Sequence, residues 1–353
     1  MNETIQFTPR QKVIINLLAT EAGTGREEIT RRLPSPFSAS KATLARDLAK
    51  LVRAKLILSV GNGPSTIYKP VRVHPLLAYV DLAQYFSLEP DSRKHARTQF
   101  NPTIFDKLPG IISEPERQEL RTDFRSFSVA TQGLDRTILE RELERYVIEL
   151  SWKSSKIEGN TYTLLETENL IKQGDEAPGR TKQEALMILN HKEAFKTIIK
   201  HRRDFRKLTA STILELHNTL TKGLNIASGL RKQAVGITGT TYRPPETEWQ
   251  IKDVFERMIE VINKIEYPLE KALLAMALIA YIQPFSDGNK RTARMLSNAL
   301  LLGHNHFPLS YRSVDENEYK EALILFFETN NLYHVKRLFI DQYRFALNTY
   351  FPS

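Results

Sequence analysis

The 353-residue sequence contains no cysteine. Disulfide bridges, thiol catalysis and cysteine-ligated zinc are therefore excluded. No apolar run reaches the roughly 20 residues that a membrane-spanning helix needs. The opening residues, MNETIQFTPRQ, also lack the apolar core of a signal peptide. We expect a cytoplasmic protein that makes no use of a membrane.

Acidic residues are scarce near the N-terminus. Residues 1–80 carry twelve Lys and Arg against five Asp and Glu, a net charge of +7 out of +9 for the whole chain. Such an asymmetry predicts an N-terminal surface for an anion, with nucleic acid as the first candidate.

The N-terminal stretch has a pattern of short helices followed by a hairpin. The segments TPRQKVIINLLA, REEITRRL and SPFSASKATLARDLAKLVRAKLI each predict a helix. In the third, Ser38 or Ser40 would cap a helix whose buried stripe is Leu44, Leu48 and Leu51. The alternating segment LILSVGNGPSTIYKP then predicts a β-hairpin that turns at its Gly-Asn-Gly-Pro.

This pattern resembles a winged helix-turn-helix domain, which we assign to residues 1–75, with Asn62 near the wing tip. In that case Lys41, Arg46 and Lys50 of the third helix would contact DNA phosphates, and binding would weaken as salt rises. A small helical protein-interaction domain with solvated charges is the alternative. Residues 76–125 read as a linker with short helices, and residues 126–350 as mostly helix.

A Gly-Asn pair in YIQPFSDGNKRTARM, residues 281–295, lies between two predicted helices. Backbone N–H groups at a helix N-terminus bind phosphate well. Arg291 and Arg294, three positions apart, can converge on the same anion. Asp287 is then a candidate Mg²⁺ ligand, because a carboxylate among phosphate groups is costly without a cation. A polyphosphate site with a metal and a plain Asp-Gly turn before a basic surface helix both fit this spacing.

Residues 283–294 resemble the signature loop of the Fic-domain family, HxFx(D/E)GNGRxxR. The matching positions are Phe285, Asp287, Gly288, Asn289, Arg291 and Arg294. The resemblance covers about residues 125–350 and implies a mostly α fold with a short β-hairpin flap.

Two further segments are similar to Fic elements. LRKQAVGITGTTYRPP resembles the flap that docks a target backbone, at about residues 234–243. Its docking positions would be Val235, Gly236, Ile237 and Thr238. SSKIEGN ends a predicted helix at about residues 140–160. It matches the autoinhibitory motif (S/T)xxxE(G/N) as Ser154, Glu158 and Gly159.

Fic proteins generally transfer AMP from ATP to a protein hydroxyl, so the resemblance implies ATP, Mg²⁺ and a protein substrate. Asp287 would hold the metal, and Gly288 and Asn289 would donate to phosphates. Arg291 and Arg294 would neutralise phosphate charge. Glu158 would pair with Arg294 and obstruct the γ-phosphate, with Ser154 holding Glu158 or the flap.

Two positions depart from the family loop. Gln283 stands where the family has its general-base histidine, and an amide takes up no proton near neutral pH. Lys290 replaces a glycine, as in Doc-like phosphotransferases of the same superfamily. His217, in LELHNTL, reads as a packed and hydrogen-bonded core histidine rather than a substitute base.

Three functions follow from these features. The first is an AMP transferase autoinhibited by Glu158, with its catalysis weakened by Gln283. The second is a nucleotide-responsive DNA-binding regulator with a degenerate Fic domain, and the third is a Doc-like phosphotransferase. The oligomeric state is left open, with a homodimer as one option.

Overall fold

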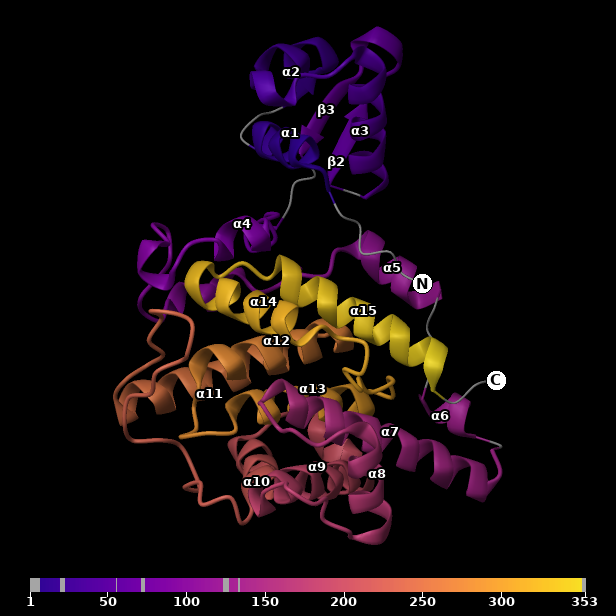
Figure 1. Ribbon diagram of the computed structural model, residues 1–353, viewed down its shortest axis with the longest axis vertical. Helices are drawn as coiled ribbons and strands as arrows, with labels where there is room; N and C mark the ends of the chain where they lie inside the picture. Colours follow the sequence, from indigo (N-terminus) through magenta and orange to yellow (C-terminus); the bar gives the residue numbers. More distant parts are fainter. Residues whose placement is uncertain are drawn as a thin grey trace. The chain divides into compact units, whose positions relative to one another are not determined.

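The structure is a computed structural model that describes residues 7–19, 23–54, 56–70, 74–122, 127–132 and 134–350. It divides into two compact units, Met1–Ala83 and Gln84–Ser353 (Figure 1). The division falls inside the region that we read as a linker. No helix among the described residues combines the length and the apolar character needed to cross a bilayer.

Three helices and a small antiparallel sheet form the first unit. They are α1 (Pro9–Ala19), β1 (Thr24–Gly25), α2 (Arg26–Arg32), α3 (Lys41–Arg53), β2 (Ile57–Val60) and β3 (Ile67–Pro70). The strand order is β1-β3-β2, and Val60 lies opposite Ile67 in the predicted hairpin. The predicted order of helices and hairpin is present, and β1 is an addition that the sequence pattern did not reveal.

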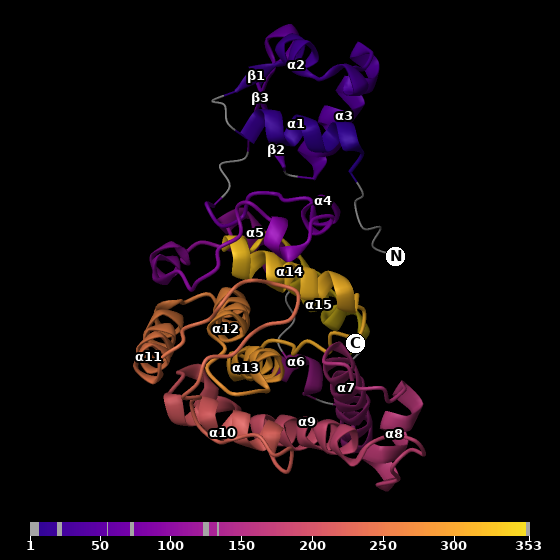
Figure 2. The same cartoon turned by 60° about the vertical axis from the view of Figure 1, so that its left-hand side comes forward.

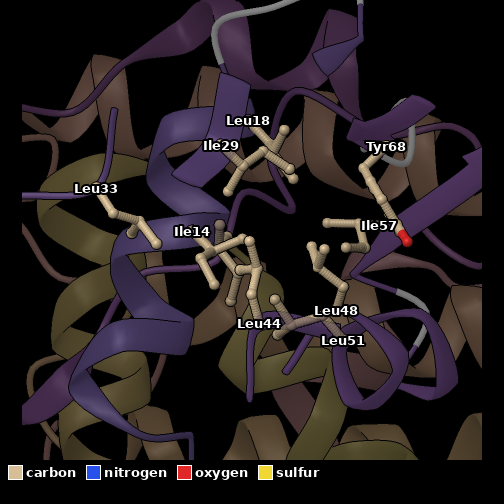
Figure 3. Close-up of a cluster of buried hydrophobic side chains, with 10 residues drawn as sticks. Ile14, Leu18, Ile29, Leu33, Leu44, Leu48, Leu51, Ile57 and Tyr68 are labelled. Carbon is tan, nitrogen blue, oxygen red and sulfur yellow. The ribbon is translucent and has the colours of Figure 1, made fainter. Parts of the chain in front are cut away.

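Apolar side chains from every helix of this unit meet in one core (Figure 3). Its members include Ile14, Leu18, Ile29, Leu44, Leu48, Leu51, Ile57 and Tyr68. Ser40 caps α3 by accepting a hydrogen bond from the Thr43 N–H, which decides between the two predicted caps. Asp47 ties α3 to α1, because its carboxylate accepts from Arg10 Nε at 2.6 Å and from Gln11 Nε2 at 2.7 Å.

The second unit is helical, as predicted. Its helices are α4 (Leu82–Phe86, at the division), α5 (Glu114–Thr122), α6 (Phe127–Thr131), α7 (Arg136–Ile157), α8 (Leu164–Gln173), α9 (Lys182–His201), α10 (Ala210–Thr221), α11 (Glu248–Lys264), α12 (Pro268–Ile282), α13 (Asn289–Gly303), α14 (Glu316–Thr329) and α15 (Tyr333–Thr349). Among the residues described in this unit, the strand pairing is a single bridge between Gln99 and Arg243.

Helices α12 and α13 lie side by side, with α14 and α15 against α12 and with α9 and α10 against α13 (Figures 1 and 2). Pro268 starts α12 at a position where its missing N–H costs nothing. Every residue of α12 after Pro268 is buried, which fits a helix that is apolar all round. The loop between these two central helices, residues 283–288, is therefore held on both sides by buried structure.

The hairpin predicted for residues 234–243 is wrong as a strand pair. This segment is irregular, with a turn at Thr238 and Gly239. Its outer arm bonds elsewhere, because the Arg243 N–H donates to the carbonyl of Thr98 at 2.9 Å. Pro244 and Pro245 follow directly and have no N–H to give to a ladder. The alternating pattern was read correctly, but the partner of the second arm lies 145 positions away in the sequence.

Candidate active site

The loop after α12 is fastened by the side chain of Asn289. Its Oδ1 accepts from the Phe285 N–H and its Nδ2 donates to the Phe285 carbonyl, both at 2.8 Å. Gly288 precedes α13 with φ of +78°, a backbone conformation that favours glycine. The first N–H groups of α13 have no acceptor within their own helix, so they remain donors at this end of the loop. The side-chain amide of Asn289 thus holds the loop through its oxygen and one of its two N–H groups.

His217 of α10 packs against the loop of residues 283–288. Its ring stacks on Phe285 with a centroid distance of 3.8 Å, and its Nε2 lies 3.0 Å from the Asp287 carbonyl oxygen. Burial lowers the pKa of His217, so the neutral ring donates through Nε2. The residue is fully buried and hydrogen-bonded, as predicted. What the sequence did not reveal is that it lies under the signature loop.

Arg291 and Arg294 are buried cations on the first turns of α13. Their side chains are only 4% and 1% exposed. Arg291 Nη2 lies 3.1 Å from Asp287 Oδ2. The Nη1 atom of each arginine has no hydrogen-bond partner among the described residues. Two buried guanidinium groups with unused donors are costly unless an anion joins them.

Glu158 supplies a negative charge to this pair of arginines. Its Oε1 lies 2.9 Å from Arg294 Nη2, and its Oε2 lies 3.9 Å from Lys290 Nζ. Burial raises the pKa of the Glu158 carboxyl, but the charges of Arg294 and Lys290 outweigh burial and leave it below its ordinary value. Glu158 is therefore ionised at neutral pH. It follows the last residue of α7, and Gly159 with φ of +94° turns the chain away.

Ser154, one turn before Glu158, has its side-chain hydrogen bonds elsewhere among the described residues rather than with Glu158 or residues 234–243, contrary to our expectation. Its hydroxyl oxygen lies 2.9 Å from Arg294 Nε, and its carbonyl accepts from Arg294 Nη2 at 2.8 Å. The same hydroxyl lies 2.8 Å from Nε2 of His191 in α9. Ser154 and Glu158 of the motif thus both contact Arg294. His191, which is hydrogen-bonded to Ser154, is a residue that the sequence did not reveal.

Comparison with known families identifies this region. Residues 207–301 match the model of the Fic/DOC family. The chain carries a Fic domain. The match spans α10 to α13 and includes the whole signature loop.

Named relatives agree with this assignment. The chain is 28% identical over 192 residues to "Protein adenylyltransferase Fic" of Nematostella vectensis, covering 52% of this chain and 44% of that protein. It is 30% identical over 178 residues to the protein of the same name in Drosophila erecta, covering 49% and 36%. The chain thus spans less than half the length of these curated relatives.

Solved structures share the fold. A fragment of Fic-1 from C. elegans superposes with a TM-score of 0.58 at 20% identity, covering 67% of this chain and 72% of that one. A Fic domain-containing signaling protein from Bacteroides thetaiotaomicron gives a TM-score of 0.55 at 21% identity, covering 65% and 93%. At these identities the likeness shows the Fic fold alone.

Gln283 ends α12 in the left-handed conformation, with φ of +49°. Its side-chain amide donates to the Ala280 carbonyl at 2.7 Å, and its side chain is buried within the Fic domain. The imidazole of His217, which stacks on Phe285 of the Fic loop, is fully buried. No group described at the position of the family histidine can therefore accept a proton near neutral pH.

Residues 230–245, which we call the flap segment, are fastened at both ends. Arg231 is buried, and its guanidinium donates to the carbonyls of Gln283, Gln233 and Pro245. At the turn, Thr240 and Arg93 both donate to the fully buried Glu328 of α14, at 2.6 and 3.0 Å. Side-chain exposure alternates as predicted along the arm: Val235 and Ile237 are half-buried, and Gly236 and Thr238 are exposed.

Asp287 offers the one carboxylate of the Fic loop to a metal. It is 70% exposed on its side chain, and its Oδ1 accepts from the Gly288 N–H. The described residues contain no group of three or more metal-binding side chains. A single exposed carboxylate fits Mg²⁺, which proteins commonly hold by one or two carboxylates together with substrate phosphates.

Lys41 and Arg46 of α3 are exposed, and Lys50 is half-buried beside Phe7, with Nζ 5.8 Å from the ring centroid. All three lie outside the core stripe of Leu44, Leu48 and Leu51. The three predicted phosphate-contacting side chains do not share one face, because at about 100° per residue Lys41 and Lys50 lie about 180° apart around α3.

Proposed function

We propose that this chain binds ATP with Mg²⁺ in the Fic loop, that Glu158 obstructs the site, and that the reaction class is AMP transfer to a protein hydroxyl. The observation that carries the proposal is the pair of buried arginines, Arg291 and Arg294. Each retains an unused Nη1 donor, and the second is occupied by a carboxylate from another helix. A carboxylate there stands in for the anion that the arginines would otherwise bind.

ATP would be bound by positively charged side chains and by backbone N–H donors. The N–H groups that open α13 would bind phosphate oxygens, and the two arginines would neutralise the phosphate tail. Asp287 would hold Mg²⁺, which neutralises charge between the phosphates when bound. Phosphoryl chemistry depends mainly on such positioning and charge neutralisation.

Glu158 would oppose this binding by charge. Its carboxylate lies on the same Nη2 of Arg294 that a γ-phosphate would need. Two anions at that point repel each other in a site of low polarity. Removal of the carboxylate therefore makes room for the phosphate and leaves the arginine with an unpaired charge that favours it.

Gln283 limits catalysis, because loss of a positioned general base typically costs about 10²–10⁴-fold in rate. Histidine is among the residues that tolerate a left-handed backbone, so Gln283→His fits the φ of +49° found here. We expect this change to raise the rate of AMP transfer by about 10²-fold or more in a Glu158→Gly background.

The test uses ATP labelled at the α or the γ phosphate, with Mg²⁺ and a mixture of protein substrates. Wild type, Glu158→Gly and Glu158→Gly/Gln283→His are compared for label on protein, with Arg294→Ala added to the double variant as a binding-deficient control. Transfer of α label supports AMP transfer. Transfer of γ label alone supports the Doc-like reaction, for which the observation is Lys290 at the position where the family loop has glycine. ATP binding without any transfer removes both enzyme functions.

A second function, nucleotide-responsive regulation at DNA, is favoured by two observations. The first is the amide at Gln283 in place of a proton acceptor. The second is the two exposed basic side chains of α3, Lys41 and Arg46, in a separate compact unit. Here the Fic domain would sense ATP and the first unit would contact phosphates of DNA. The fluorescence anisotropy of a labelled duplex, titrated with protein with and without ATP, separates this function from transfer.

A further inference from the structure

A line of buried polar groups runs behind Arg294. His191 and Arg294 have no exposed surface, and Ser154 has 1%. His191 Nδ1 lies 2.7 Å from the Met187 carbonyl oxygen, and its Nε2 lies 2.8 Å from Ser154 Oγ. Ser154 Oγ lies 2.9 Å from Arg294 Nε. These contacts join α9, α7 and α13 through three side chains.

The direction of each hydrogen bond in this line is fixed by chemistry. A carbonyl oxygen only accepts, so Nδ1 of His191 carries a hydrogen. Burial lowers the pKa of His191 to about 3, so the ring is neutral and its Nε2 has no hydrogen. Nε2 must then accept from the Ser154 hydroxyl. Because a hydroxyl has one hydrogen, Ser154 Oγ is left with only lone pairs for Arg294 Nε.

We propose that His191 is a positioning residue for the phosphate-binding arginine: it takes the Ser154 hydroxyl hydrogen and so makes Ser154 a pure acceptor for Arg294. The inference rests on the proposed nucleotide-binding function. Without His191, the Ser154 hydroxyl would turn to the carbonyl of Leu150, the usual acceptor for a serine inside a helix. Arg294 Nε would then lose an acceptor that is held in a fixed direction.

The grip on Arg294 is distinct from the contact with Glu158. Ser154 holds Nε through its hydroxyl and Nη2 through its carbonyl, whereas Glu158 meets only Nη2. Departure of Glu158 therefore leaves Arg294 oriented by Ser154, with the Nη2 donor that faced Glu158 free for a new anion. His191 thus keeps Arg294 oriented for a phosphate even when the carboxylate of Glu158 is absent.

The first test measures the Kd of ATP with Mg²⁺ by calorimetry in the full-length chain. In the Glu158→Gly background, His191→Leu is expected to weaken binding roughly tenfold, since a hydrogen bond to a charged group is lost. His191→Gln, whose amide oxygen can accept from Ser154, is expected to keep most of the affinity. His306→Leu is the matched control: it removes another buried histidine, one bonded to Tyr343. The proposal is wrong if His191→Leu binds ATP as well as the background does, or loses no more affinity than His306→Leu.

The second test needs no nucleotide. In ¹⁵N-labelled protein, His191 is expected to show the Nδ1–H tautomer, with an Nε2 shift that moves when Ser154 is changed to Ala. If the Nε2 chemical shift of His191 is unchanged by Ser154→Ala, the hydrogen bond between His191 and Ser154 is contradicted. If the tautomer and shift are as expected but Glu158→Gly binds no ATP, the proposed nucleotide function fails while the line that orients Arg294 stands.

Discussion

Arg231 donates from Nε to the backbone carbonyl oxygen of Gln283 across 2.6 Å. The same guanidinium reaches Gln233 and Pro245, so one buried side chain joins both ends of the flap segment to the end of α12. These acceptors are neutral carbonyls, and within the described structure Arg231 forms no ion pair. Its contribution therefore comes from geometry rather than from charge pairing.

Arg231→Met, which keeps the apolar stem, is expected to lower the free energy of unfolding by about 2–4 kcal/mol, because two buried carbonyls and one partly buried carbonyl lose their donor. Urea denaturation measures this loss. Limited proteolysis should also cut faster within residues 232–244, since the segment is released at both ends. The neighbouring Lys232→Met is the control: that side chain is 75% exposed, and its loss should change stability by less than about 0.5 kcal/mol. Equal effects of the two changes would contradict the role of Arg231.

Gly288 and Gly179 form a matched pair of glycines, with φ of +78° and +77°. A Cβ at Gly288 would lie 3.0 Å from Thr221 Cγ2 and 3.5 Å from His217 Nε2, whereas a Cβ at Gly179 meets nothing within 4 Å. Both alanine variants should lose about 1 kcal/mol from backbone strain. Gly288→Ala should lose about 1–3 kcal/mol more, as well as ATP affinity, because Thr221 or the loop must shift. Thermal unfolding and ATP titration measure the two losses, and similar values for both variants would refute the packing argument.

Glu158 gives stability a defined pH dependence. Its pKa in the folded chain lies below the ordinary value of 4.5, so its stabilising charge is fully present above that value and is lost as the pH falls through the folded pKa. The stability difference between wild type and Glu158→Gln should thus be constant from about pH 6 to 8 and shrink below pH 4.5. Urea denaturation across this range measures it. Glu256→Gln, at a side chain 57% exposed, controls for general acid effects. A difference that varies near pH 7 would contradict the assignment.

The exposed Lys41 and Arg46 of α3 predict a salt-dependent affinity for DNA. In the full chain, Lys41→Gln and Arg46→Gln should each reduce the slope of log K against log salt by about 1, equally for unrelated duplex sequences. Arg31→Gln on α2, where the side chain is 77% exposed and already paired with Glu28, should leave the slope unchanged. Anisotropy titrations at several salt concentrations provide the slopes. Binding without any salt dependence would remove α3 as a nucleic-acid surface.

The sequence allowed much of this molecule to be predicted, because its strongest signals are local. The helix after Ser40 follows from a capping residue and a stripe of leucines, and both are seen in α3. The Fic loop follows from a long motif of fixed spacing, and the family match covers it. The pairing of Glu158 with Arg294 was reached through the resemblance and is present as an ion pair.

What escaped prediction depends on contacts between distant segments. Ser154 was expected to hold Glu158 or the flap, but the sequence of the 22-residue helix α7 gives no sign that α9 places His191 against Ser154. The flap was expected to pair with itself, but its outer arm meets Thr98 and Gln99. His217 looked like any core histidine, because only the folded chain shows that Phe285 stacks on it.

The place of Glu158 at the end of α7 has a consequence for how the site opens. Helix ends fray, and a carboxylate at the negative C-terminal end of a helix is unfavourable without nearby cations. Arg294 and Lys290 therefore hold a residue that its own helix tends to release. Ser154 lies a full turn further inside, where the helix is intact. We expect a movement of Glu158 alone, beyond the last helical residue Ile157, to withdraw the charge while Ser154 keeps Arg294 in place.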